Sequence, residues 1–314
     1  MPPYRCRGAP DTGRAAVTAI LAMLIALAAG WVVRRLDAFP VDGAEALNRF
    51  VLWICLPALV LARVPGLSLR AELLALALTP WIISALVAGA VIALGRVFEW
   101  SRSVVGCLLL LAVLGNTSFL GFPLVTALLG AEHVQLAAVY DQFGTFLLVS
   151  SYGLVVLAAY GDQDRPSARA IARRVVAFPP FIALIIALAL PGPLPDSARD
   201  VCEALAAPLL PLVAFALGLK LRLRLPPGRW TPLVAGLGLK LVLMPLACWL
   251  MLAPLPVSDI VRQVAALEAA MPPMFTAAAL AISADIEPEL SAALVGYGLI
   301  IGLATVFAWS WLVA

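Results

Sequence analysis

The sequence contains few charged residues. Of its 314 residues, only 12% are Asp, Glu, Lys or Arg, whereas 63% are hydrophobic and the mean hydropathy is +1.04. A soluble domain is usually near half apolar and a quarter charged. The polar surface is too small to cover a globule in water, so we expect a protein embedded in a lipid bilayer. The 21 basic residues exceed the 18 acidic ones too little to indicate a nucleic-acid partner.

The chain also lacks the residue groupings of enzymes and metal sites. It has one histidine, His133, and five cysteines without a CxxC pair, so no metal site is expected. HExxH, GxSxG and Asp-rich diphosphate motifs are absent, which argues against an intramembrane enzyme. A GxxxxGK[ST] loop is absent too, which argues against ATP hydrolysis on this chain. No cofactor is expected.

Long apolar runs predict an all-α membrane protein with ten transmembrane helices. The longest polar link, residues 161–174, separates a first repeat (1–160) from a second (175–314), with five helices each. An odd number of spans per set makes the second set enter the membrane upside down, which is the pattern of an inverted repeat. The expected spans lie near residues 15–33, 47–64, 73–94, 104–129, 135–159, 175–190, 204–220, 232–253, 260–284 and 290–313.

The distribution of basic residues among the loops predicts the orientation. Loops on the side of the two termini carry seven Lys and Arg, and the opposite loops carry thirteen. The more cationic side normally faces the cytoplasm. We therefore expect a plasma (inner) membrane protein whose linker 161–174 is cytoplasmic and whose termini are both outside, in the periplasm.

The fourth expected span is interrupted by residues that break helices. Its sequence LGNTSFLGFPLV (114–125) contains Gly115, Gly121 and Pro123. Irregular backbone at membrane depth is tolerated only where it is buried in protein or lines a wet cavity. The polar side chains available to satisfy freed backbone groups, or to hold a substrate, are Asn116, Thr117 and Ser118.

The ninth span is interrupted at the corresponding place in the second half. Its sequence LEAAMPPMFTAAA (267–279) contains Met271, Pro272 and Pro273, and proline lacks a backbone N–H and clashes with the preceding turn. Paired interruptions indicate a transporter binding site near the midplane. A half-helix that begins there directs free N–H groups at an anion, and one that ends there offers carbonyls to a cation.

The stretches GNTSFLGFPL, EAAMPPMFTAAALA and LWICLPALVLARV resemble the auxin efflux carrier family, some of whose bacterial members are described as malonate transporters. The resemblance covers nearly the whole chain. It implies two inverted five-helix repeats, broken helices 4 and 9 that cross, a scaffold of helices 1, 2, 6 and 7, a transport bundle of helices 3–5 and 8–10, a homodimer, and organic-anion substrates. The matching crossover asparagine is Asn116, but Glu268 and Ala269 stand where a second asparagine would be expected. A symmetric clamp of two asparagines is therefore not expected.

Three ionisable residues fall within expected spans: Asp141, Lys240 and Glu268. A charge at the bilayer centre costs at least ~2.5–3.5 kcal/mol, so such residues normally face the bundle interior and pair. Glu268 is either a coupling group that takes up a proton or cation, or the structural partner of Lys240. Lys240 is alternatively a ligand of an anionic substrate. Asp141 is expected nearer the outer end of its span, within reach of water.

These features together predict a secondary transporter of small organic anions, such as carboxylates, that works by alternating access and is driven by membrane potential or protons. A sodium-coupled organic-anion symporter similar to the bile-acid carriers is the alternative. A sensor or channel on the same fold is a third interpretation. A sodium site requires several oxygen ligands at the crossing, and the apolar run AMPPMF leaves few candidates: Glu268, Asn116, Thr117, Ser118 and Thr276.

Overall fold

The computed structural model describes residues 12–36, 39–40, 42–65, 71–161, 169, 173, 176–221, 223–225 and 227–313. Throughout these residues the ordered elements are helices, and no β-strand occurs in them. Most of the expected linker 161–174 lies outside the described residues, as do residues 1–11. All the expected site residues lie within these ranges.

The helices of the first half follow the expected spans closely, with short loops between them. In chain order they are α1 (Thr12–Arg35), α2 (Gly43–Phe50), η1 (Val51–Cys55), α3 (Leu56–Arg63), α4 (Ala71–Val97), α5 (Arg102–Leu111), η2 (Thr117–Gly121), α6 (Phe122–Leu128), η3 (Ala131–His133), α7 (Val134–Tyr140), η4 (Asp141–Thr145), α8 (Phe146–Ser150) and α9 (Tyr152–Tyr160).

The second half consists of shorter helices and one long helix at its end. Its helices are α11 (Pro179–Ala189), α12 (Asp196–Ala206), α13 (Leu209–Lys220), α14 (Trp230–Gly238), η5 (Leu239–Leu243), α15 (Met244–Leu252), α16 (Asp259–Ala270), α17 (Phe275–Ser283) and α18 (Pro288–Leu312).

Six helical segments in the described ranges are long and apolar enough to cross a membrane, by length and composition. Three apolar helices are shorter: Arg102–Leu111, Thr117–Leu128 and Pro179–Ala189. The prediction of an all-helical protein with membrane-spanning segments is confirmed at this level, whereas the ten-span inverted repeat stays a prediction. The six segments are Gly43–Arg63, Ala71–Val97, Ala131–Tyr160, Asp196–Lys220, Trp230–Leu252 and Pro288–Leu312.

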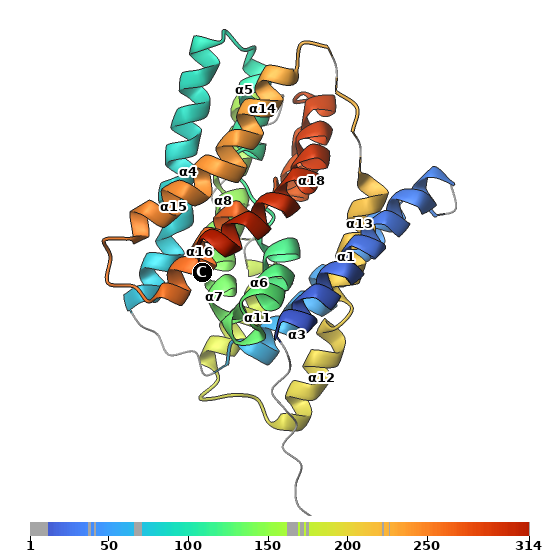
Figure 1. Ribbon diagram of the computed structural model, residues 1–314, viewed down its shortest axis with the longest axis vertical. Helices are drawn as coiled ribbons and strands as arrows, with labels where there is room; N and C mark the ends of the chain where they lie inside the picture. The colour runs from blue at the N-terminus through green and yellow to red at the C-terminus, as the bar shows by residue number, and fades with distance from the viewer. Residues whose placement is uncertain are drawn as a thin grey trace, which may run out of the picture.

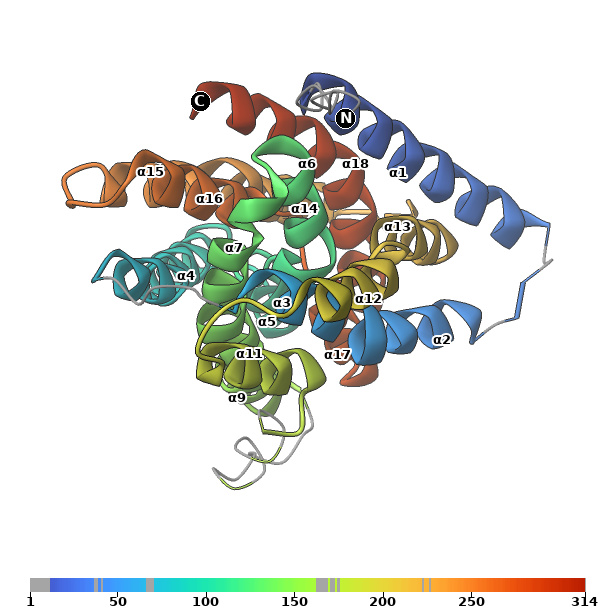
Figure 2. The same ribbon diagram turned by 90° about the horizontal axis from the view of Figure 1, so that it is seen from below.

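One side of the molecule is built on close contact between α1 and α13, which lie side by side in both views (Figures 1 and 2). A Cβ on Gly30 would lie 2.2 Å from the carbonyl oxygen of Phe215, and one on Gly218 would lie 2.1 Å from that of Leu27. Glycine is therefore required on both helices for their backbones to approach this closely, as is common between membrane helices. On the same side α13 packs on α2, and α3 packs on α11 and α12.

The opposite side is formed by α4, which packs against α7, α15 and α16 (Figures 1 and 2). The α5 helix begins after Ser101, whose Oγ accepts a hydrogen bond from the N–H of Val104 at 3.3 Å, and it contacts α9, α14, α17 and α18. The two interrupted spans meet inside this bundle, where α16 of the ninth span packs against η2 of the fourth. The backbone at both breaks is buried in protein.

The break in the fourth span lies earlier than the sequence indicates. The α5 helix ends at Leu111, and the chain is non-helical only until Asn116. Gly121 and Pro123 were expected to break the span, and this was wrong, because both lie in the continuous helix Thr117–Leu128. Pro123 is tolerated because it follows the π-helical segment η2, whose wider turn leaves room for a residue without an N–H.

Candidate functional site

The two interrupted spans cross at their breaks and are joined by their backbones. Gly115 and Pro273 form an isolated antiparallel bridge. The N–H of Asn116 donates to the carbonyl of Pro272, and the N–H of Met274 donates to the carbonyl of Leu114, each at 2.9 Å. Both segments are buried, so peptide groups released from their helices have to find partners inside the protein. Each break supplies the other with them.

Asn116 stands at the centre of this crossing with its side chain unused. Only 1% of the residue is exposed. Within the described part of the chain, neither Nδ2 nor Oδ1 of its amide has a hydrogen-bond partner. An unpaired buried polar group costs about 1–3 kcal/mol, and native proteins retain few of them. The crossing fixes the backbone of Asn116. Its side-chain amide is left at this position with a free donor, Nδ2, and a free acceptor, Oδ1.

Glu268 approaches the crossing from the last turn of α16. It is fully buried, and neither carboxyl oxygen has a hydrogen-bond partner among the described residues. A Cβ on Gly121 would lie 2.3 Å from its Oε2 and 2.6 Å from its Oε1. The carboxyl group therefore lies against η2 of the other interrupted span. Gly121 therefore does not break the helix. Its missing side chain leaves space for the carboxyl group of Glu268.

Lys240 reaches the crossing from η5, in the eighth expected span. Its Nζ donates to the carbonyl of Ala269 at 2.8 Å and contacts Sδ of Met244 at 3.0 Å. That carbonyl belongs to the last turn of α16, where the helix dipole favours a cation. A Cβ on Gly115 would lie 2.8 Å from Nζ, so the ammonium group touches the break itself.

The expected alternative of a direct Glu268–Lys240 pair is not realised, and the described residues contain no ion pair between them. The ammonium group is directed to a backbone carbonyl instead, because it lies over the end of α16. Met244 is a contact that the sequence reading missed. The spacing i, i+4 from Lys240 could have indicated it, since such residues share one face of a helix.

Asp141 is deeply buried, and its expected position within reach of water was wrong. Its carboxylate accepts hydrogen bonds from Thr117 Oγ1, from Ser118 Oγ at 2.6 Å and from Gln142 Nε2 at 2.5 Å. Thr117 and Ser118 were expected to satisfy freed backbone groups, but their hydroxyls donate to this carboxylate. These hydrogen bonds hold η2 against η4, the π-helical segment between α7 and α8.

The crossing thus gathers most of the expected site residues in one buried region. Asn116, Met271, Pro272 and Pro273 form the crossing itself, whereas Pro123 lies beyond it in α6. Thr276 was a candidate oxygen ligand, but it is exposed. The three ionisable groups, Asp141, Lys240 and Glu268, sit on or against π-helical segments, which are frequent at functional sites. The side chains that surround the crossing are Thr117, Ser118, Gly121, Asp141, Lys240 and Glu268.

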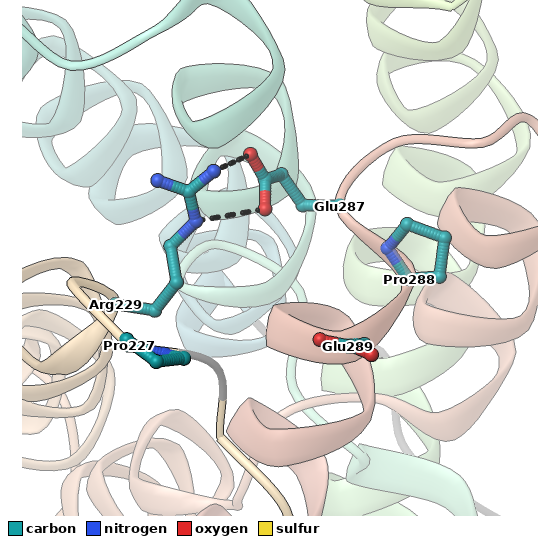
Figure 3. Close-up of a pocket in the computed structure, with 5 residues that line it drawn as sticks. All are labelled: Pro227, Arg229, Glu287, Pro288 and Glu289. Atoms are coloured by element: carbon teal, nitrogen blue, oxygen red, sulfur yellow. Dashed lines mark hydrogen bonds and ion pairs between the residues drawn. The ribbon is translucent and has the colours of Figure 1, made fainter.

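A separate pocket of about 320 Å³ lies at the start of α18 (Figure 3). Arg229 donates from Nε and Nη2 to the two carboxyl oxygens of Glu287, at 3.0 and 2.7 Å. The guanidinium fork is thus already bound by a carboxylate, and none of the crossing residues lines this pocket. The ion pair between Arg229 and Glu287 connects the segment before α14 to the start of α18. The lining residues are Pro227, Arg229, Glu287, Pro288 and Glu289.

Comparison with known proteins identifies relatives along most of the chain. A sequence model of the membrane transport protein family matches residues 15–310. A protein of Methanothermobacter thermautotrophicus, described as an uncharacterized transporter, is 27% identical over 304 residues, which cover 93% of this chain and 96% of the relative. Another uncharacterized transporter, from Methanocaldococcus jannaschii, is 22% identical over 306 residues, which cover 93% and 97%.

Proposed function

The chain belongs to the membrane transport protein family, the auxin efflux carrier family that its sequence resembles, and from this premise we propose that it is a secondary transporter of small organic anions. It is a multi-pass membrane transporter and not an enzyme. The proposal adds to this a class of substrate, a binding site, a mode of coupling and an alternating-access mechanism.

The single observation that carries the proposal is the buried, unpaired amide of Asn116 at the crossing. Its Nδ2 can donate to a carboxylate oxygen, and its Oδ1 can accept from a hydroxyl of the substrate. Two helices, Thr117–Leu128 and α17, begin beside it, and their first N–H groups have no partner within their own helix. Helix N-termini favour anions through these free N–H groups and the helix dipole.

Lys240 places an amine that can carry a positive charge beside the same site. Its ammonium group has three hydrogens, and two of its contacts are the carbonyl of Ala269 and the sulfur of Met244. The buried position makes its attraction for an anion stronger than it would be in water. A small carboxylate between Asn116 and Lys240 would therefore meet an amide donor, helix N-termini and a cation.

Glu268 is the proposed proton carrier. A buried carboxylate without a hydrogen-bond donor is costly, and a proton removes that cost. Uptake of a proton from one side and its release on the other would couple transport to the proton gradient. Transport driven by the membrane potential alone remains compatible with the same substrate site.

A sodium-coupled symporter of the bile-acid carrier type is the second candidate. The observation that favours it is a group of buried side-chain oxygens without hydrogen-bond partners, which includes Gln142, a residue absent from the candidates taken from the sequence. Oδ1 of Asn116, Oε1 of Gln142 and both carboxyl oxygens of Glu268 have no partner in the described residues, and Asp141 lies nearby. Oxygen ligands of this kind suit hard cations.

The architecture implied by the family is proposed for this chain too. Ten spans in two inverted repeats would place α1–α3 and α11–α13 in a scaffold and the other helices in a bundle that moves against it. The close packing of α1 on α13, and of α3 on α11 and α12, supports this division. A homodimer with both termini outside completes the proposal.

The proposal is tested with purified protein in liposomes. A panel of mono- and dicarboxylates is first screened for thermal stabilisation, because a ligand at 100 times its Kd stabilises the folded state by about 2.7 kcal/mol. Flux of the stabilising anion is then measured for the wild type, for Asn116→Ala and for Asn48→Ala, a half-buried asparagine of α2. We expect Asn116→Ala to lose saturable flux while remaining folded, and Asn48→Ala to keep it.

Wild-type flux in Asn116→Ala would remove this residue from the site. Loss of flux on replacing sodium with choline would select the second candidate, the sodium-coupled symporter.

A further inference from the structure

The proposed function gives Lys240 a place beside the anion, but it does not explain why the ammonium group is bound at the end of α16. It is the only lysine or arginine among the fully buried residues that the structure describes, and 1% of it is exposed. It does not pair with either buried carboxyl group, Asp141 or Glu268, by direct contact. Its ammonium group is bound at the end of α16, on the carbonyl of Ala269.

The surroundings of this ammonium group are those of a cation site. The last carbonyls of α16 carry the negative end of the helix dipole. The neighbouring Glu268 has two carboxyl oxygens without a partner, and Asn116 has an unpaired amide oxygen, all in the described residues. Without Lys240 this region would combine two buried carboxyl groups with free carbonyl oxygens and no positive charge, which is an unfavourable arrangement inside a protein.

We propose that Lys240 is a tethered counter-cation, which occupies at the end of α16 the place that a monovalent metal ion would otherwise have to fill. It follows that the wild-type protein binds its anion without a metal ion. The transport consequence rests on the proposed function, whereas the consequence for cation binding does not. The inference also opposes the sodium-coupled alternative, because the ammonium group of Lys240 already supplies the positive charge that a sodium ion would bring to the end of α16.

The first test is the salt dependence of thermal stability near neutral pH. Lys240→Met removes the charge and keeps most of the side-chain length. The variant is compared in NaCl, KCl, LiCl and choline chloride at equal ionic strength. We expect one of the metal ions to raise its unfolding midpoint relative to choline, and we expect the wild type to show no such difference. A Lys240→Met variant that responds to none of the three metal ions overturns the inference, and so does a wild type that requires one of them.

Two further variants serve as controls. Lys240→Arg keeps the charge and should remain insensitive to the metal ion. Lys220→Met alters the other lysine of the chain. Lys220 is partly exposed at the end of α13, with Nζ 3.7 Å from Oε2 of Glu45. The Lys220→Met variant should behave as the wild type. A metal-ion response in Lys220→Met would show a general salt effect and would contradict the proposal.

Removal of a buried charge can also prevent folding, so the double variant Lys240→Met/Glu268→Gln is prepared in parallel. It removes one negative charge with the positive one, and we expect it to fold in choline chloride without a metal-ion response. If Lys240→Met fails to fold in choline and is recovered by a metal ion, the inference is supported. If no metal ion recovers it, the inference is wrong, whether or not the double variant folds.

Flux measurements separate this inference from the proposed function. Anion flux of the wild type should be equal in sodium and choline, whereas flux of Lys240→Met should require the metal ion that stabilises it. If the wild type carries no carboxylate in any salt, the proposed function fails, and the stability measurements still decide the role of Lys240. Wild-type flux that depends on sodium would refute the inference and leave the transporter function intact.

Discussion

The contact between Gly121 and Glu268 gives a sharp test of the crossing. A Cβ added at Gly121 would lie 2.3 Å from Oε2 of Glu268, whereas ordinary contacts begin at 3.4 Å, so this oxygen has to move by about 1.1 Å. The carboxyl group is the far end of a flexible side chain, and it will move before the backbone does. Gly121→Ala therefore displaces the proposed proton carrier without changing its chemistry.

The expected cost follows from the packing. Added atoms in a packed interior typically cost about 1–3 kcal/mol. Gly238→Ala is the matched control, because Gly238 also lies in a helix and a Cβ there meets no atom within 4 Å. Alanine is favoured over glycine in a helix by about 0.8–1.0 kcal/mol, so Gly238→Ala should be neutral or stabilising.

The assay is the unfolding midpoint of each variant in one detergent at one heating rate. Gly121→Ala should unfold below the wild type and Gly238→Ala at or above it. In the double variant Gly121→Ala/Glu268→Ala the displaced carboxyl group is gone, so the two changes should be non-additive, with an interaction energy of about 0.5–3 kcal/mol. Equal midpoints for the two glycine variants, together with additive effects in the double variant, would refute the placement of Glu268 against the fourth span.

Three further predictions concern the same region and the helix contact beside it. Thr117→Val should destabilise the protein by about 1.5–3 kcal/mol, since its hydroxyl donates to the buried carboxylate of Asp141, whereas Thr126→Val loses only a bond to a carbonyl of its own helix and should cost less in the same unfolding assay. Glu268→Gln should retain anion binding but lose the pH dependence of flux; an unchanged pH profile would leave Glu268 a structural residue. Gly30→Ala should destabilise strongly, because its Cβ would meet backbone that cannot move independently, and a midpoint equal to the wild type would contradict the close approach of α1 and α13.

The sequence predicted the locations of the interruptions better than their extent. Pro272 and Pro273 lie in the non-helical segment of the ninth span, as expected, because two consecutive residues without an N–H leave few ways to continue a helix. Gly121 and Pro123 are also residues that commonly interrupt helices, yet both lie in the helix Thr117–Leu128. The π-helical turn of η2 accommodates the proline, and no pattern in the sequence distinguishes such a turn from a break.

The buried charges show a similar division. Hydropathy alone identified Asp141, Lys240 and Glu268 as residues that must face protein, because a charge in lipid is too costly. It did not identify their partners, and the Glu268–Lys240 pair, one of the two interpretations of Glu268, is absent as a direct contact. The access of water to Asp141 was also misjudged, since it depends on which neighbouring side chains cover the carboxyl group.

The amino-acid sequence by itself determined that this chain is helical, that it belongs in a membrane and that two of its spans are interrupted. Each of these follows from properties of the chain read locally: the run of apolar residues, the scarcity of charge and the missing N–H of proline. Only the tertiary structure decided that the two breaks exchange backbone hydrogen bonds and that Lys240 binds the end of α16. These contacts join residues more than a hundred positions apart, or on different helices, and their distances depend on how the helices pack against one another.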